Sequence, residues 1–342
     1  MRHQFIGMLY TICIFYCNTN YSQNKSKYFC SKIVFYNVEN LFDTIDNPVK
    51  IDNAYLPSNG WNTKKYLSKI KSISQIIPTI GDTITQIPAD IIGLCEIENK
   101  RVLTDLIQHP NLKKYHYDFI HHESLDIRGI DVALLFRKSS FVVTNVQSHQ
   151  LILQTPSSKS EKKPNKKFTR DQLLVSGKLH GKPIHFIIIH WPSRSKGKKT
   201  SEPYRIQAAN LTRTILKNTS QSFPNQPIIV MGDFNDNPND KSINTLLSLK
   251  ENLIITNPFT QAFKNSFGTI AYRDSWHLFD QIILFNIKNN NWTHWKSGIY
   301  NNVSLINENG KFKGYPKRFK NSEIGYSDHF PVFMYLLYLI KE

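Results

Sequence analysis

The chain has 342 residues, of which 40% are hydrophobic and 20% are charged. This composition is ordinary for a globular protein, and it excludes a long disordered or collagen-like chain. Lys and Arg number 43 against 26 Asp and Glu, which gives a formal net charge of +17. Such a charge attracts polyanions such as nucleic acid or anionic lipid, although a solvated basic surface without a specific partner would look the same.

The N-terminus has the pattern of a secretory signal peptide. A basic start precedes an apolar run from Phe5 to Cys17, and a polar segment with a plausible cleavage site near Ser22 follows. The sequence therefore predicts a signal peptide at 1–22 and a secreted, periplasmic or cell-surface protein. An uncleaved N-terminal anchor is the alternative, because the apolar run is short for a membrane span.

Cysteine usage gives little constraint. Cys13 and Cys17 lie in the predicted signal peptide, which leaves Cys30 and Cys95 in the mature chain. Two cysteines cannot form a metal cluster. They could form one disulfide in an oxidising compartment, or Cys95, within an apolar strand, could be a buried free thiol.

Short runs rich in β-formers alternate with segments that carry apolar residues at helix spacing. Strands are predicted at Lys32–Tyr36, Ile91–Cys95, Val132–Phe136, Leu173–Leu179, Ile184–Ile189, Ile228–Met231, Gln281–Phe285 and Pro331–Leu337. Helices are predicted at Lys64–Ile77, Val102–Gln108 and Pro203–Lys217. This alternation favours an α/β sandwich over an all-β barrel.

Three polar, Lys-rich stretches interrupt the pattern, and all are predicted to be surface loops. They are Ser157–Arg170, Ser193–Ser201 and Asn301–Asn321. None has the length or composition of a linker between independent domains, and no internal repeat is visible. Residues 23–342 are therefore predicted to form one domain.

Several predicted strands end in carboxylate, Asn or His side chains. Asn37 and Glu39 follow the first strand, Glu96 the second, His190 a later one, and Asp233 another. Each alone is compatible with an ordinary turn or helix cap. Because strand ends on one edge of a sheet are neighbours in space, these groups could converge on one site.

A convergent set of oxygen ligands suits Mg²⁺, Mn²⁺ or Ca²⁺, and the lack of a Cys/His cluster argues against structural zinc. Such a cation would neutralise phosphate oxygens and stabilise the charge of an in-line displacement. The chemistry also needs a group that activates water and donors for the developing charge. The sequence therefore points to metal-assisted phosphoester cleavage.

The order of these motifs resembles that of the endonuclease/exonuclease/phosphatase superfamily, to which deoxyribonuclease I belongs. The resemblance runs from about Lys32 to Leu337, and its most specific parts are Gly-Asp-Phe-Asn, beginning at Gly232, and Ser-Asp-His-Phe-Pro-Val, beginning at Ser327. It implies a four-layered α/β sandwich with two packed mixed β-sheets. It also implies a secreted bacterial type of enzyme.

The resemblance assigns four residues to the metal. Glu96 would be the principal ligand of a Mg²⁺, Mn²⁺ or Ca²⁺ ion. Asn37 and Glu39 would complete the edge that faces metal and phosphate. Asp328 would be a further ligand of the metal or of water.

The resemblance assigns catalysis to five residues. Asp233 would orient or deprotonate the attacking water, while Asn235 and His190 would donate to the phosphoryl oxygens. His329 would face the scissile phosphate with Asp280 as its partner. This pair also has a physical rationale, because a carboxylate fixes the imidazole tautomer and raises its pKa, favouring the charged form beside a phosphate.

Arginines near these motifs are candidates for binding substrate. Arg128 could hold a phosphate bidentately, and a surface ion pair with Asp126 or Asp131 is an equal interpretation. Arg194 is a weaker candidate, as is Arg205.

Nucleic acid is the first substrate hypothesis, because basic loops flank His190 and Ser327 and their charges could follow a phosphate backbone. Aromatic residues among them, Trp191, Tyr204 and Tyr315, could stack on bases. A phospholipid or inositol-phosphate phosphoesterase is the alternative, with Trp292 and Trp295 at a membrane interface. An inactive nucleic-acid-binding module is a further alternative. No obligate protein partner is evident, and a monomer is expected.

Overall fold

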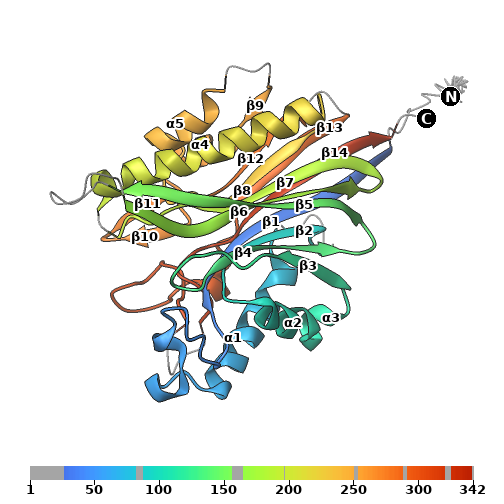
Figure 1. The fold of residues 1–342 in the computed structure, drawn as a ribbon. Helices are drawn as coiled ribbons and strands as arrows, with labels where there is room; N and C mark the ends of the chain where they lie inside the picture. Colours follow the sequence, from blue (N-terminus) through green and yellow to red (C-terminus); the bar gives the residue numbers. More distant parts are fainter. Residues whose placement is uncertain are drawn as a thin grey trace, which may run out of the picture.

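Two six-stranded mixed β-sheets form the centre of the computed structural model (Figure 1). The first sheet has the order β13-β14-β1-β2-β4-β3, and the second has the order β5-β6-β7-β8-β12-β9. Each sheet has one parallel pair in its middle, β1 with β2 in the first and β7 with β8 in the second, and its other pairs are antiparallel.

The structure describes residues 27–81, 88–155, 165–195, 197–249, 253–287, 291–319 and 325–340. The predicted signal peptide lies outside them and stays a prediction. The strands are β1 (Lys27–Leu41), β2 (Ile91–Ile97), β3 (Tyr117–His121), β4 (Asp131–Arg137), β5 (Phe141–Thr155), β6 (Asn165–Leu179), β7 (Lys182–His190), β8 (Ile228–Asp233), β9 (Ile255–Thr256), β10 (Ile270–Tyr272), β11 (Ser275–His277), β12 (Asp280–Phe285), β13 (Trp292–Ile299) and β14 (Val332–Ile340). The helices are η1 (Asn53–Tyr55), η2 (Pro57–Asn59), α1 (Thr63–Ile76), η3 (Ile77–Thr79), α2 (Lys100–Gln108), α3 (Pro110–Lys113), α4 (Lys198–Ser222), α5 (Lys241–Leu247), α6 (Phe259–Lys264) and η5 (Val303–Leu305).

Side chains alternate across each strand and divide the interior into three apolar layers. On β1, Val34 and Tyr36 pack with α1 and α2, whereas Ile33 and Phe35 point into the layer between the sheets. Helices α4 and α5 cover the outer face of the second sheet, as Figure 1 shows. The predicted sandwich of helices, two mixed sheets and helices is confirmed.

The inner strands were predictable because they are buried on both faces and read as apolar runs. The edge strands β5 and β13 were missed, since many of their residues are exposed and polar. Two predicted loops are wrong at their ends: β6 begins at Asn165, within the predicted loop Ser157–Arg170, and α4 begins at Lys198, within the predicted loop Ser193–Ser201.

The structure also bears on the two cysteines, on two of the tryptophans and on membrane-spanning helices. No disulfide joins Cys30 and Cys95, and of the two alternatives left open by the sequence the structure shows the buried thiol at Cys95. Trp191 and Trp292 are buried, which removes the first from base stacking and the second from a membrane interface. Within the described residues, no helix combines the length and apolar character needed to cross a bilayer.

Candidate active site

Three predicted catalytic residues lie side by side across three adjacent strands of the second sheet. His190 at the end of β7 pairs in register with Asp233 at the end of β8, and Asp233 pairs with Asp280 at the start of β12. All three side chains are buried. The register of the sheet therefore builds a His-Asp-Asp row at one edge of the sandwich.

Gly232 allows this row to form. A Cβ atom at this position would lie 2.1 Å from the carbonyl oxygen of Ile189 on β7, a distance that no side chain tolerates. The glycine of the Gly-Asp-Phe-Asn motif is thus required by the close approach of two backbones.

Asn37 on β1 joins the first sheet to this row. Its Nδ2 atom donates to Oδ2 of Asp233 at 3.1 Å and to Oε1 of Glu96 at 3.4 Å. Its Oδ1 atom accepts from the backbone N–H of Glu39 at 2.9 Å. The two sheets therefore meet at the site through one amide side chain.

Glu39 and Glu96 have backbones in the left-handed region, with φ of 52° and 63°. Both lie where the pairing register of their strand shifts, between Asn37 and Leu41 on β1 and between Cys95 and Ile97 on β2. Left-handed backbone is unfavourable for a glutamate and costs about 1 kcal/mol or more. These strand irregularities aim both carboxylates at the site.

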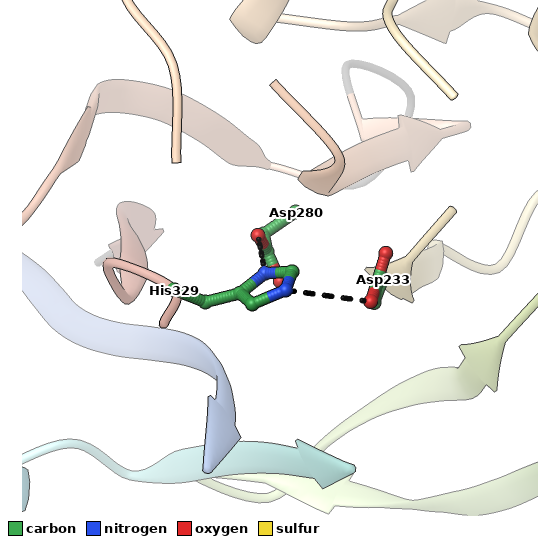
Figure 2. A group of neighbouring side chains, drawn as sticks. All are labelled: Asp233, Asp280 and His329. Carbon is green, nitrogen blue, oxygen red and sulfur yellow. Dashed lines mark hydrogen bonds and ion pairs between the residues drawn. The ribbon is translucent and has the colours of Figure 1, made fainter. Parts of the chain in front are cut away.

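His329 lies just before β14 and faces both carboxylates of the row (Figure 2). Its Nδ1 atom is 2.7 Å from Oδ2 of Asp280, and its Nε2 atom is 4.0 Å from Oδ2 of Asp233. The Ser327 hydroxyl anchors the turn: it donates to the Asn37 carbonyl at 2.7 Å and accepts from the His329 N–H at 3.0 Å.

The Asp280 carboxylate sets the charge of His329. Burial alone would lower the pKa of this imidazole, but the charge of Asp280 and its hydrogen bond hold that pKa well above its usual range. The imidazole is therefore a cation at neutral pH, with Nε2–H directed toward the site.

Burial shifts the pKa values of Asp233 and His190 in opposite directions. Burial raises the pKa of the Asp233 carboxyl to about 7; the nearby Asp280 raises it as well, while His329 lowers it. Burial, and then the charge of Arg170, lower the pKa of His190 well below its usual range. At neutral pH the site thus holds a carboxyl poised to exchange a proton and a neutral imidazole, whose Nε2 lies 3.6 Å from Asp233.

Asn235 also has a left-handed backbone, with φ of 50°, a conformation that asparagine tolerates better than most residues. Its N–H donates to Oδ1 of Asp233 at 2.8 Å, and its Nδ2 donates to the Trp191 carbonyl at 3.0 Å. In this structure its amide therefore holds the loop, and donation to a phosphoryl oxygen stays a prediction.

The predicted metal ligands Glu39, Glu96 and Asp328 lie on the first-sheet side of the site. Burial first, and then the charge of Asp328, raise the pKa of the Glu39 carboxyl to about 7. Its Oε2 atom is buried and has no hydrogen-bond partner among the described residues. Repelling carboxylates with an orphaned oxygen are the donor set that a hard divalent cation would neutralise, so these residues fit the predicted ion.

A second group of ligand atoms could also hold an ion: Asp233, Asp280 and His329 have atoms within 4.8 Å of one another. The fold therefore offers two places with ligand atoms for a cation, this cluster and the carboxylates of Glu39, Glu96 and Asp328, and the assignment of the metal to the latter stays a prediction.

The two predicted substrate-binding arginines differ in their exposure and in their contacts with protein acceptors. Arg128 is exposed, and its Nη2 donates to Oδ1 of Asn40 at 3.2 Å. Arg194 is enclosed by protein acceptors: it donates to the Asn235 carbonyl at 2.8 Å and to the carboxylates of Asp236 and Asp240 at 2.6 and 2.5 Å. Both substrate-binding roles stay predictions. The contacts of Arg194 hold together the loop that contains Asn235, Asp236 and Asp240.

Three basic residues of the site were missed in the sequence. Arg318 donates from Nε to Oε1 of Glu39 at 2.6 Å, and its Nη2 lies 3.4 Å from Oδ2 of Asp328. The buried Arg170 donates to the Trp191 carbonyl at 2.8 Å. Lys69 on α1 is also buried, which lowers its pKa to about 8. No motif marks these residues, because their partners are distant in the chain.

Comparison with known proteins gives consistent results. A family model described as "Endonuclease/Exonuclease/phosphatase family" matches residues 32–338. No match is found among curated proteins.

Several solved structures share the fold. An endonuclease/exonuclease/phosphatase family protein from Bacteroides thetaiotaomicron has a TM-score of 0.57 at 16% identity, covering 93% of this chain and 98% of that chain. A mannosyl-6-phosphatase from Bacteroides thetaiotaomicron VPI-5482 has a TM-score of 0.55 at 17% identity, covering 90% and 99%. D. rerio TDP2 complexed with a single-strand DNA product has a TM-score of 0.55 at 14% identity, covering 90% and 98%. At these identities the likeness concerns the fold alone.

Proposed function

The chain belongs to the endonuclease/exonuclease/phosphatase family and is a phosphoric ester hydrolase, and we propose that it is a metal-dependent phosphodiesterase that cleaves nucleic acid. The observation that carries the chemistry is the Asp280–His329 pair facing Asp233 across the row of strand ends. These three neighbouring residues supply an acid, His329, a base, Asp233, and a carboxylate, Asp280, that orients the acid.

The proposed mechanism follows from the charge states. Asp233, with a pKa of about 7, accepts a proton from the attacking water and holds that water in line. The oxygen of the water bonds to phosphorus as the opposite P–O bond breaks. The Nε2 atoms of the protonated His329 and the neutral His190 donate to the phosphoryl oxygens as negative charge develops on them, and His329, as the acid of the site, gives its proton to the leaving oxygen. A divalent cation bound by Asn37, Glu39, Glu96 and Asp328 would neutralise a further phosphate oxygen.

Basic charge supports nucleic acid as the substrate. The formal charge of +17 attracts a polyanion, and the exposed Arg128 and Arg318 lie beside predicted metal ligands or their neighbours. The solved structures with this fold include both a protein bound to single-strand DNA and a mannosyl-6-phosphatase. We further propose that the chain is exported by residues 1–22 and acts as a monomer.

The test uses the purified protein with plasmid DNA, RNA, sphingomyelin and bis(p-nitrophenyl) phosphate, each with Mg²⁺, Mn²⁺, Ca²⁺ or chelator. We expect metal-dependent cleavage of DNA or RNA that falls by at least about a hundredfold in Asp233→Asn. The matched control is Asp118→Asn, which changes a surface carboxylate that pairs with Lys138.

Turnover of sphingomyelin without nucleic acid cleavage would overturn the substrate and favour the phospholipid alternative. Tight DNA binding with no turnover of any phosphoester would overturn the enzymatic proposal and favour a binding module.

A further inference from the structure

A pocket of about 580 Å³ opens beside the candidate active site. One wall is the hairpin of β10 and β11, at one end of the sandwich in Figure 1, and the other is the segment Asn307–Arg318. Asp328 and Arg318 line this pocket and also belong to the active site. A group bound in this pocket could therefore belong to the same substrate molecule as a phosphate that faces His329.

The two walls are fastened to each other. The Tyr315 hydroxyl donates to Oδ1 of Asp274 at 2.6 Å and accepts from the Asp274 N–H at 2.9 Å. Arg273 and Asp274 form the tip of the hairpin, with left-handed φ of 47° and 60°, as a two-residue turn of this kind requires. The pocket thus has a defined width.

Aromatic and cationic side chains line the pocket together. Tyr272 is 61% exposed and Phe312 is 49% exposed, although both are large aromatic residues. Cations lie over their rings: the Arg273 guanidinium is 5.2 Å from the centre of the Tyr272 ring, and the Lys311 Nζ atom is 5.9 Å from that of Phe312. Exposed aromatic residues beside positive charge are the elements that bind bases and phosphates of a single strand.

The lining also discriminates among ligands. An acyl chain would cover Arg273 and Lys311 without giving their charges a partner. A lone phosphate would leave the exposed rings unused. A base with its attached phosphate uses both, and the volume lies within the range of about 300–1,000 Å³ that is usual for small-ligand sites.

We propose that this pocket binds the unpaired base of the nucleotide next to the scissile phosphate, which makes the preferred substrate a single-stranded nucleic acid or a frayed end. The inference rests on the proposed phosphodiesterase function and deepens it. A base inside a duplex is stacked and paired, and it can enter such a pocket only after it has been unpaired and unstacked, which costs free energy.

The experiment measures binding in the presence of chelator, where turnover does not interfere. A fluorescein-labelled single-stranded DNA of about ten nucleotides and its duplex are titrated with the full chain by fluorescence anisotropy. The salt concentration is held constant, because phosphate contacts make affinity salt-dependent. We expect the single strand to bind about tenfold more tightly than the duplex.

Variants locate this preference. Tyr272→Ala should weaken single-strand binding about tenfold and leave duplex binding nearly unchanged, whereas Tyr272→Phe should retain the affinity because it keeps the ring. The matched control is Tyr28→Ala, which removes a tyrosine of similar exposure, 51%, from the far end of β1. Thermal unfolding checks that each variant is folded.

Equal affinity for single strand and duplex would overturn the inference, as would a Tyr272→Ala variant that binds the single strand like Tyr28→Ala. Displacement of the DNA by mannose 6-phosphate but not by a nucleoside monophosphate would also overturn it. A different result would overturn the phosphodiesterase proposal. If no phosphoester is hydrolysed but DNA binding still depends on Tyr272, the proposed hydrolytic function is wrong and the assignment of the pocket is retained.

Discussion

The Nδ1 atom of His329 lies 2.7 Å from the Oδ2 atom of Asp280, whose side chain is 0% exposed. The two residues belong to different sheets, since Asp280 begins β12 of the second sheet and His329 lies in the turn before β14 of the first. Their contact therefore makes the charge of the imidazole depend on how the two sheets pack.

Replacing Asp280 by Asn should lower the pKa of His329. The substitution removes the charge and the hydrogen bond of Asp280, which raise this pKa most, while burial continues to lower it and the smaller contributions of Asp233 and Asp328 remain. We expect the rate to drop by about 10²–10⁴-fold at neutral pH, where less of the imidazole is protonated, and to stay low at acidic pH, because the Asp233 carboxyl, with a pKa of about 7, is protonated there and cannot accept a proton from water. The pH–rate profile and an NMR titration of the imidazole measure this. An imidazole that titrates at the same pH in the variant as in the unsubstituted protein would contradict the assignment.

Replacing Glu96 by Gln should weaken divalent-metal binding by at least about tenfold while keeping the shape of the side chain. Glu96 accepts from the Asn40 N–H at 2.9 Å, and an amide oxygen can keep that bond, so the fold should be maintained. Isothermal titration with Mg²⁺ and Mn²⁺ measures the affinity. Glu123→Gln, at an exposed position, is the control, and equal metal affinity in the two variants would remove Glu96 from the site.

Gly232→Ala should destabilise the protein far more than Gly93→Ala. Both glycines lie in central strands, but a Cβ at 232 would lie 2.1 Å from the Ile189 carbonyl oxygen, whereas one at 93 meets side-chain atoms of Phe35 and Met231 at 3.0 to 3.1 Å. A flexible methionine can move and a strand backbone cannot. We expect a loss of about 1–3 kcal/mol or more at 232, read from urea unfolding midpoints. Similar midpoints would show that β7 and β8 can separate.

Glu98 should make stability fall as pH rises. Burial raises the pKa of its carboxyl from 4.5 to about 8, so the folded state holds a proton that the unfolded state has already released. The contribution is fully present below pH 4.5 and is lost as pH rises through about 8. Glu98→Gln should abolish this decline when melting temperature is followed against pH in chelator. A pH dependence equal to that of the unsubstituted protein would contradict it.

The sequence predicted the fold where strands are buried on both faces. β2 and β8 read as apolar runs that end in polar side chains, and this pattern located both strands and their site residues. The sequence did not predict β5, because this edge strand exposes polar residues along much of its length. The start of β6 was also missed, because Asn165 lies in a Lys-rich stretch.

The candidate site was predictable as a set of residues but not as a set of charges. The order of motifs named Asp233, Asp280 and His329 together, whereas the pairing of Arg318 with Glu39 depends on a contact between distant loops. The left-handed backbones of Glu39 and Glu96 leave no mark in the sequence either, since asparagine and glycine are the residues that usually signal them.

The pairing of β1 with β14 has a consequence for how the protein folds. Lys27 pairs with Ile340 and Phe35 pairs with Val332, so the centre of the first sheet joins segments from opposite ends of the described chain. Contacts this distant in sequence form slowly, because a long loop must close before they contribute stability. Since His329 lies directly before β14, catalytic competence should require that strand to be in place, and a growing chain would remain inert until β14 has paired with β1.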